Sequence, residues 1–201
     1  MAEKANMENR EACKQFFMKH MSKIREDIRE QLAERAADNL IRYYSLLRST
    51  GVPGMEDMIA AIHGSTFSIS NSCHHHHYPS GTMEHCLGVY KRMSEAAVLL
   101  REKGNEIKES DVILVALLHD VCRGKRREWS DYPRHGLRSR LIVERYLPEL
   151  SPDVLEAIEK HMHEPTNSNL LWSLVRDNDY PDGLTCNRGE AKLSDTENCR
   201  L

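Results

Sequence analysis

The spacing of apolar residues follows the helical repeat along most of this chain. In residues 7–48, apolar side chains recur every three or four positions within a charged, helix-prone segment. A turn rich in glycine and proline ends that segment, and a short helix fits residues 55–62. Residues 64–80 are rich in Ser, Asn and His, which predicts a loop.

Two apolar helices are expected after that loop. The first has Gly81 as its N-cap and is ended by Gly104. The second has Ser110 as its N-cap, runs through the apolar stretch Val112–Leu118 and continues to Cys122. The β-branched residues of this stretch also suit a buried strand, but its cap and its length favour a helix.

Three more helices are predicted in residues 136–146, 152–163 and 169–178. The helix at 152–163 has a well-formed start, with Ser151 as the N-cap and Pro152 at the first helical position. From Gly183 onward the chain is polar, and this tail is expected to be frayed or disordered. The chain shows no alternation of strands and helices, so the predicted fold class is all-α.

Composition narrows the protein class. The 201 residues suffice for one sizeable core, and the net charge of −3 gives no overall basic field for nucleic acid. The longest apolar run has seven residues, well below the roughly 20 of a membrane-spanning helix, and the first residues are charged. Six cysteines form no CxxC pair and are interpreted as reduced thiols. A cytoplasmic protein without membrane contact is expected.

A group of histidines and acids carries the candidate chemistry. His119 and Asp120 end the most apolar helix, where an unpaired carboxylate would cost several kcal/mol, and a metal ion would compensate for that cost. The alternative is a capping histidine followed by a solvated aspartate. His161 lies on the buried stripe of its helix, although a single histidine there is more often an ordinary core residue. Nitrogen and oxygen donors without thiolate suit Mn, Fe, Co, Ni, Zn or Mg in an open catalytic site. The candidates come from separate helical segments: His85, His119, Asp120, His135, His161 and the pair Asp177 and Asp179.

In order and spacing these residues resemble the H…HD…H…H…D ligand series of the HD-domain superfamily of metal-dependent phosphohydrolases. The resemblance covers residues 73–183 and includes the segments ALLHDVCR, IEKHMH and DNDYPDG. The segment HHHYPSGTMEHCLGV is also similar to a motif of a subgroup that includes 3′–5′ exoribonucleases, with His75 and His76 matching its paired histidines. Ser80 and Thr82 depart from that motif, and an internal expression tag is the alternative for the four histidines in a row.

The resemblance implies an HD-domain helical bundle that holds one or two divalent metal ions. It implies that His85, His119, Asp120 and Asp179 hold one ion, that His135 and His161 are available for a second, and that Asp120 bridges. Asp177 competes with Asp179, which is preferred because Asp182 follows it by three residues, as in family members. Many relatives have Gly and Lys where this chain has Cys122 and Arg123, so the role of that lysine does not transfer.

The expected catalytic residues are Asp120 and Arg123, and the expected substrate-binding residues are His75, His76, Lys125 and Arg126. A solvated basic loop is the alternative for the cluster at residues 123–127. Glu84 and Glu128 are candidate proton carriers by position alone.

The predicted function is hydrolysis of a phosphate ester of a nucleotide or another small phosphorylated molecule by a metal-activated water. A di-iron oxygenase of the HD type and a non-catalytic, metal-binding regulatory module are the alternatives. The predicted organisation is an N-terminal helical extension (1–54), an HD domain (55–183) and a polar tail (184–201). The N-terminal helices are expected to cover the site or to form a homodimer contact.

Overall fold

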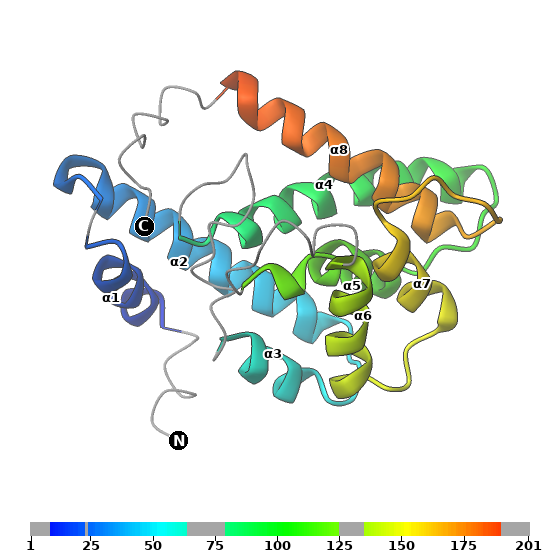
Figure 1. Ribbon diagram of the computed structural model, residues 1–201, viewed down its shortest axis with the longest axis horizontal. Helices are drawn as coiled ribbons and strands as arrows, with labels where there is room; N and C mark the ends of the chain where they lie inside the picture. Colours follow the sequence, from blue (N-terminus) through cyan, green and yellow to red (C-terminus); the bar gives the residue numbers. More distant parts are fainter. Residues whose placement is uncertain (1–8, 23, 64–78, 125–134, 190–201) are drawn as a thin grey trace.

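The computed structural model describes residues 9–22, 24–63, 79–124 and 135–189, and every regular element in these ranges is helical (Figure 1). This confirms the all-α fold class. None of the helices in these ranges has the length and apolar character needed to cross a membrane. In chain order the elements are α1 (Arg10–His20), α2 (Glu26–Ser49), α3 (Met55–His63), α4 (Gly81–Glu102), α5 (Glu109–Leu118), the 3₁₀ turn η3 (Val121–Gly124), α6 (His135–Tyr146), α7 (Pro152–Lys160) and α8 (Leu170–Gly189).

Helix α5 lies at the centre of the bundle. It packs against α2, α4, α7 and α8, and all residues from Val112 to Leu118 are buried. An element that is apolar on every side fits this central position. The structure therefore makes the apolar run a helix and not a strand.

The N-terminal segment predicted as continuously helix-prone forms two helices, α1 and α2, joined by a turn. The amide of Ile24 donates to the carbonyl of Met21 in this turn, and both side chains are buried. The apolar spacing therefore continues through the turn, and for this reason the spacing did not reveal the break between α1 and α2. Helix α1 folds back along α2, where Lys14 contacts Glu30 and Glu34.

Several predicted helix ends move by a few residues. Helix α4 begins at Gly81, and its N-cap is Ser80 in the left-handed region (φ 74°), so the prediction of Gly81 as the cap was wrong. Helix α5 is capped by Lys108 instead of Ser110. It ends at Leu118 instead of Cys122, and the 3₁₀ turn η3 then ends at Gly124. The shifts at the two starts are of one and two residues, which is common at helix ends.

The ends of α7 and α8 also differ from the prediction. The Ser151 cap of α7 is confirmed, since its side chain accepts from the amide of Val154. Helix α7 ends at Lys160, before the predicted end at residue 163. Helix α8 continues to Gly189, beyond the predicted end at residue 178, through polar residues that show no apolar periodicity.

Candidate metal centre

Helices α5 and α7 each end one residue before a histidine. His119 and His161 are the C-caps, both with helical backbone angles. The Nδ1 atom of His119 lies 2.9 Å from the carbonyl oxygen of Ala116, and that of His161 lies 2.8 Å from the carbonyl oxygen of Ile158. Because a carbonyl oxygen only accepts, we assign the ring proton to Nδ1 in both residues. The Nε2 atom of each ring then carries a free lone pair.

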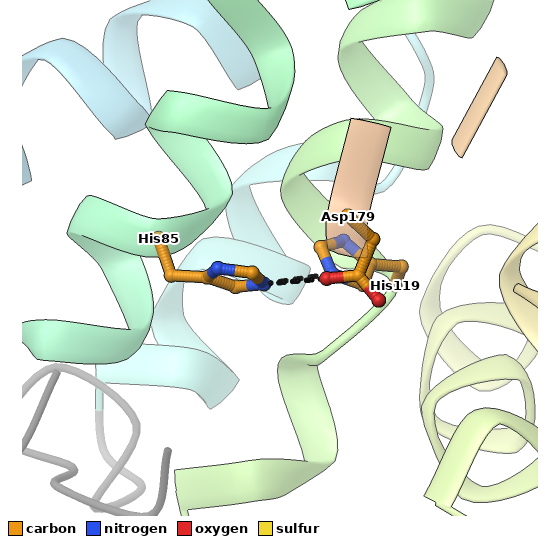
Figure 2. Close-up of side chains that lie close together, drawn as sticks. All are labelled: His85, His119 and Asp179. Carbon is orange, nitrogen blue, oxygen red and sulfur yellow. Dashed lines mark hydrogen bonds and ion pairs between the residues drawn. The ribbon is translucent and has the colours of Figure 1, made fainter. Parts of the chain in front are cut away.

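One half of the site joins α4, the end of α5 and α8 (Figure 2). The Nε2 atom of His85 lies 3.3 Å from that of His119 and 3.0 Å from Oδ1 of Asp179. The same carboxylate oxygen lies 3.7 Å from Nε2 of His119. Figure 2 shows the two rings and the carboxylate pointing toward one another.

The other half joins the end of α5 with α6 and α7. The Nε2 atoms of His135 and His161 lie 2.8 Å apart. The Oδ1 atom of Asp120 is 3.2 Å from the first and 3.6 Å from the second. The second oxygen of Asp120, Oδ2, lies 3.9 Å from Nε2 of His85 in the first half. One aspartate therefore directs one oxygen toward each half.

The candidate donor residues are shielded from solvent, which changes their protonation. His119 and Asp120 are 0% and 3% exposed, and the other histidines of the site are also buried. Burial lowers the pKa of His161 to about 3, with neighbouring His119 adding to this effect, so its ring is neutral at pH 7. Burial alone would raise the pKa of Asp179, but contacts with the rings of His119 and His85 outweigh it and hold that pKa well below its ordinary value.

The donor chemistry fits a divalent metal ion. The ligand atoms of His85, His119 and Asp179 lie within 4.8 Å of one another, as do those of His119, Asp120 and His161. Imidazole and carboxylate donors suit Zn, Mn, Fe, Co or Ni, and the carbonyl contacts at Nδ1 are the outer contacts typical of metal-binding histidines. HD domains bind divalent metals, and these clusters could hold such ions.

A close approach of α6 to α7 brings His135 and His161 together. A Cβ atom on Gly136 would lie 2.1 Å from the carbonyl oxygen of Glu159, so only glycine fits there without a shift. Cys122 fastens the same end of α6, because its Sγ lies 3.2 Å from the carbonyl oxygen of His135 and its amide donates to Oγ of Ser139. Cys122 is thus part of the support of this half. Its departure from the family pattern was the one sign of this role in the sequence.

The structure brings together all six of the predicted metal-ligand residues, and their role as ligands stays a prediction. Of the two competing acids, Asp179 lies in the cluster, whereas Asp177 is exposed. The carboxylate of Glu84 pairs with Arg35 and Asn39 of α2, and its role as a proton carrier stays a prediction.

The remaining predicted residues fall outside what the structure describes. The backbone of Arg123 lies in η3, but its side chain lies outside the described part, as does that of Asp182 in α8. His75, His76, Lys125, Arg126 and Glu128 lie in the two ranges that are not described. The predicted phosphate contacts therefore stay predictions. Among the cysteines whose side chains the structure describes, Cys13, Cys86 and Cys122 are reduced, as expected.

Arg92 of α4 was not among the predicted site residues, but its guanidinium contacts the carbonyl oxygen of Asn178, next to Asp179. A signal was present, because Arg92 follows His85 by seven residues and so lies on the same face of the helix, two turns along.

Comparison with known proteins agrees with this arrangement. The family model described as HD domain matches residues 82–198. A dihydroneopterin 2′,3′-cyclic phosphate phosphodiesterase from Methanocaldococcus jannaschii is 25% identical over 169 residues, which cover 79% of this chain and 65% of that protein. The chain thus spans slightly less than two thirds of that relative's length. No solved structure matches the chain significantly. Since the family model matches more than half of the sequence, the chain belongs to the HD-domain family.

Proposed function

We propose that this protein is a metal-dependent phosphohydrolase that cleaves a phosphate ester of a small molecule. The position of Asp120 is the observation that carries this proposal. Its two carboxylate oxygens face separate histidine pairs, Oδ2 toward His85 and Oδ1 toward His135 and His161. An aspartate that bridges two cations would have this orientation, and paired metal ions are a common basis of phosphoryl hydrolysis.

Each half of the site would hold one metal ion. His85, His119 and Asp179 would hold one ion, His135 and His161 would hold the other, and Asp120 would contact both. A divalent ion bound there lowers the pKa of a coordinated water and polarises a phosphoryl oxygen. The carbonyl groups of Ala116 and Ile158 fix the rings of His119 and His161 in the tautomer that leaves Nε2 free. The chain thus presents a rigid, pre-oriented donor set.

The first substrate class to examine is a phosphodiester of a small molecule, including cyclic phosphodiesters. The name of the archaeal relative specifies a 2′,3′-cyclic phosphate, and the alignment with it covers most of this chain. In such a hydrolysis, water adds to phosphorus, one P–O ester bond breaks, and the leaving oxygen takes up a proton. The cations Arg123, Lys125 and Arg126 are the predicted partners of the phosphate oxygens.

Metal analysis combined with a substrate panel tests this function. Protein purified without added metal is analysed for bound elements and then assayed with Mn²⁺, Mg²⁺, Ni²⁺ or Fe²⁺ on phosphomonoesters, 2′,3′-cyclic nucleotides and bis-p-nitrophenyl phosphate. We expect bound transition metal and metal-dependent cleavage of at least one ester. His119→Ala is expected to lose both the metal and the turnover. His163→Ala, which changes an exposed histidine outside the cluster, is the matched control.

Two outcomes would contradict the proposal and favour the alternative functions. Bound iron with oxygen-dependent turnover and no phosphate release would indicate an oxygenase. Stoichiometric metal with no turnover on any ester would indicate a binding module.

A further inference from the structure

Asp179 lies on a part of α8 where a proline interrupts the helical hydrogen bonds. Pro181 lies within this helix, two residues after Asp179. Proline has no amide proton, so the helix lacks the hydrogen bond from residue 181 to the carbonyl of Asp177. The turn that presents Asp179 is therefore less well fixed by its own helix than an ordinary turn would be.

Arg92 of the neighbouring helix α4 holds this turn from outside. Its Nε and Nη2 atoms lie 3.2 and 3.1 Å from the carbonyl oxygen of Asn178. Helices α4 and α8 pack side by side, as Figure 1 shows, and Arg92 is half-buried between them. Two N–H groups of a planar guanidinium therefore converge on a single backbone oxygen.

This contact acts on Asp179 through the peptide bond. The carbonyl of Asn178 and the amide nitrogen and Cα of Asp179 belong to one planar peptide unit. Fixing that carbonyl therefore fixes the plane from which the side chain of Asp179 starts. The same helix α4 carries His85, whose Nε2 lies 3.0 Å from Asp179. Arg92 and His85 thus tie Asp179 to a single rigid element.

We infer that Arg92 is a positioning residue that sets the metal affinity of the half-site formed by His85, His119 and Asp179 through its clamp on the Asn178 carbonyl. The half-site of His135 and His161 is built from α6 and the end of α7, and by this inference it does not depend on the clamp. This inference rests on the proposed metal-dependent function. It adds that a substitution of Arg92, which is not a metal ligand, changes the metal affinity of one half-site and leaves that of the other unchanged.

The test is a Co²⁺ titration of the full-length, metal-free protein, followed by visible absorption, with stoichiometry from equilibrium dialysis and elemental analysis. In Arg92→Met we expect one class of Co²⁺ site to weaken about 10- to 100-fold, the usual effect of removing an outer contact of a metal ligand. The other class should stay within about twofold of wild type. Arg101→Met is the matched control, because Arg101 also lies on α4 and also donates through Nε to a backbone carbonyl, that of Ile107, away from the site.

Two further variants separate positioning from general instability. Arg92→Lys keeps the charge but loses the paired N–H geometry, so its Co²⁺ affinity should fall between those of wild type and Arg92→Met. In an Asp179→Asn background, Arg92→Met should change Co²⁺ affinity by less than about twofold, because the group that it positions is already altered.

Three outcomes would overturn the inference. The first is a Co²⁺ affinity in Arg92→Met equal to that of wild type, and the second is an equal loss of affinity at both classes of Co²⁺ site. The third is that the effects of Arg92→Met and Asp179→Asn on Co²⁺ affinity simply add. A wild-type protein that binds no Co²⁺ would overturn the proposed function as well, whereas wild-type binding that is insensitive to Arg92 would overturn this inference alone.

Discussion

Gly136 shows how one absent side chain determines the geometry of the candidate site. It follows His135 directly, and its Cα faces the carbonyl groups at the end of α7, the helix that His161 caps. Any side chain there would separate α6 from α7 and so lengthen the 2.8 Å contact between the two histidine rings. The need for glycine at this position is therefore a matter of packing, with a direct consequence for the site.

We predict that Gly136→Ala lowers the free energy of unfolding by about 1–3 kcal/mol, the usual cost of overpacking a close contact. It should also reduce metal stoichiometry, because His135 moves away from His161. Urea unfolding and elemental analysis after dialysis measure the two effects. Gly104→Ala is the control, because Gly104 has φ +88° and open space around it, so alanine is strained there without affecting the site. Full metal content in Gly136→Ala would show that the close approach is not needed.

At the scale of elements, Glu156 of α7 organises the connection that leads into α8. Its carboxylate accepts from Lys160, Asn167 and Asn169. The side chain of Asn169 in turn accepts from the amides of Leu171 and Trp172 at the start of α8. Glu156 therefore connects α7 to the N-terminus of the helix that carries Asp179.

This connection makes a prediction about pH. The hydrogen bond from Lys160 is the largest cause that lowers the pKa of Glu156 to about 2, from an ordinary value of 4.5. A carboxyl group with a lowered pKa in the folded state contributes stability above pH 4.5, and this contribution is lost as the pH falls toward 2. Glu156→Gln should therefore be less stable than wild type at pH 6, by at most about 1 kcal/mol, and the difference should shrink below pH 4.5.

Urea unfolding of both proteins between pH 7 and pH 2.5 measures this difference. Glu149→Gln changes an exposed glutamate and serves as the control, with little effect expected at any pH. A difference between wild type and Glu156→Gln that stays constant over this range would contradict the assigned role of the ionised carboxylate.

The sequence predicted the helical type of these elements because α4 and α7 have periodic apolar faces, and because the length of the predicted α5 segment favours a helix over a strand. It also selected the six side chains that converge, because their order matches a family pattern. It could not show the break between α1 and α2, where buried Met21 and Ile24 continue the helical spacing through a turn. The spacing of Arg92 and His85 indicates a shared face of α4, but the sequence could not show which atoms Arg92 and Cys122 contact, because both contacts end on backbone carbonyls.

For the whole molecule, the N-terminal helices and the helices around the candidate site share one core. The buried residues of α2 belong to the same apolar cluster as those of α4, α5 and α8. The hydroxyl of Tyr43 in α2 donates to the carbonyl of Leu117, two residues before His119, and Tyr43 is fully buried. The predicted boundary near residue 54 stays a prediction. From the shared core we expect the N-terminal extension and the helices around the site to unfold together.

We predict that Tyr43→Phe lowers the free energy of unfolding by about 1–2 kcal/mol, because the buried hydrogen bond to Leu117 is lost. A single transition should persist when unfolding is followed both by circular dichroism and by release of bound metal, since α2 and α5 unfold together. Tyr90→Phe is the matched control, because the Tyr90 hydroxyl bonds Glu109 in a half-buried position and its loss should have a smaller effect. If the N-terminal helices formed a separate unit, Tyr43→Phe would split the transition, and metal would stay bound through the first step. Coincident transitions would instead show that the N-terminal helices and the candidate metal centre unfold in one cooperative step, with a single free energy of unfolding.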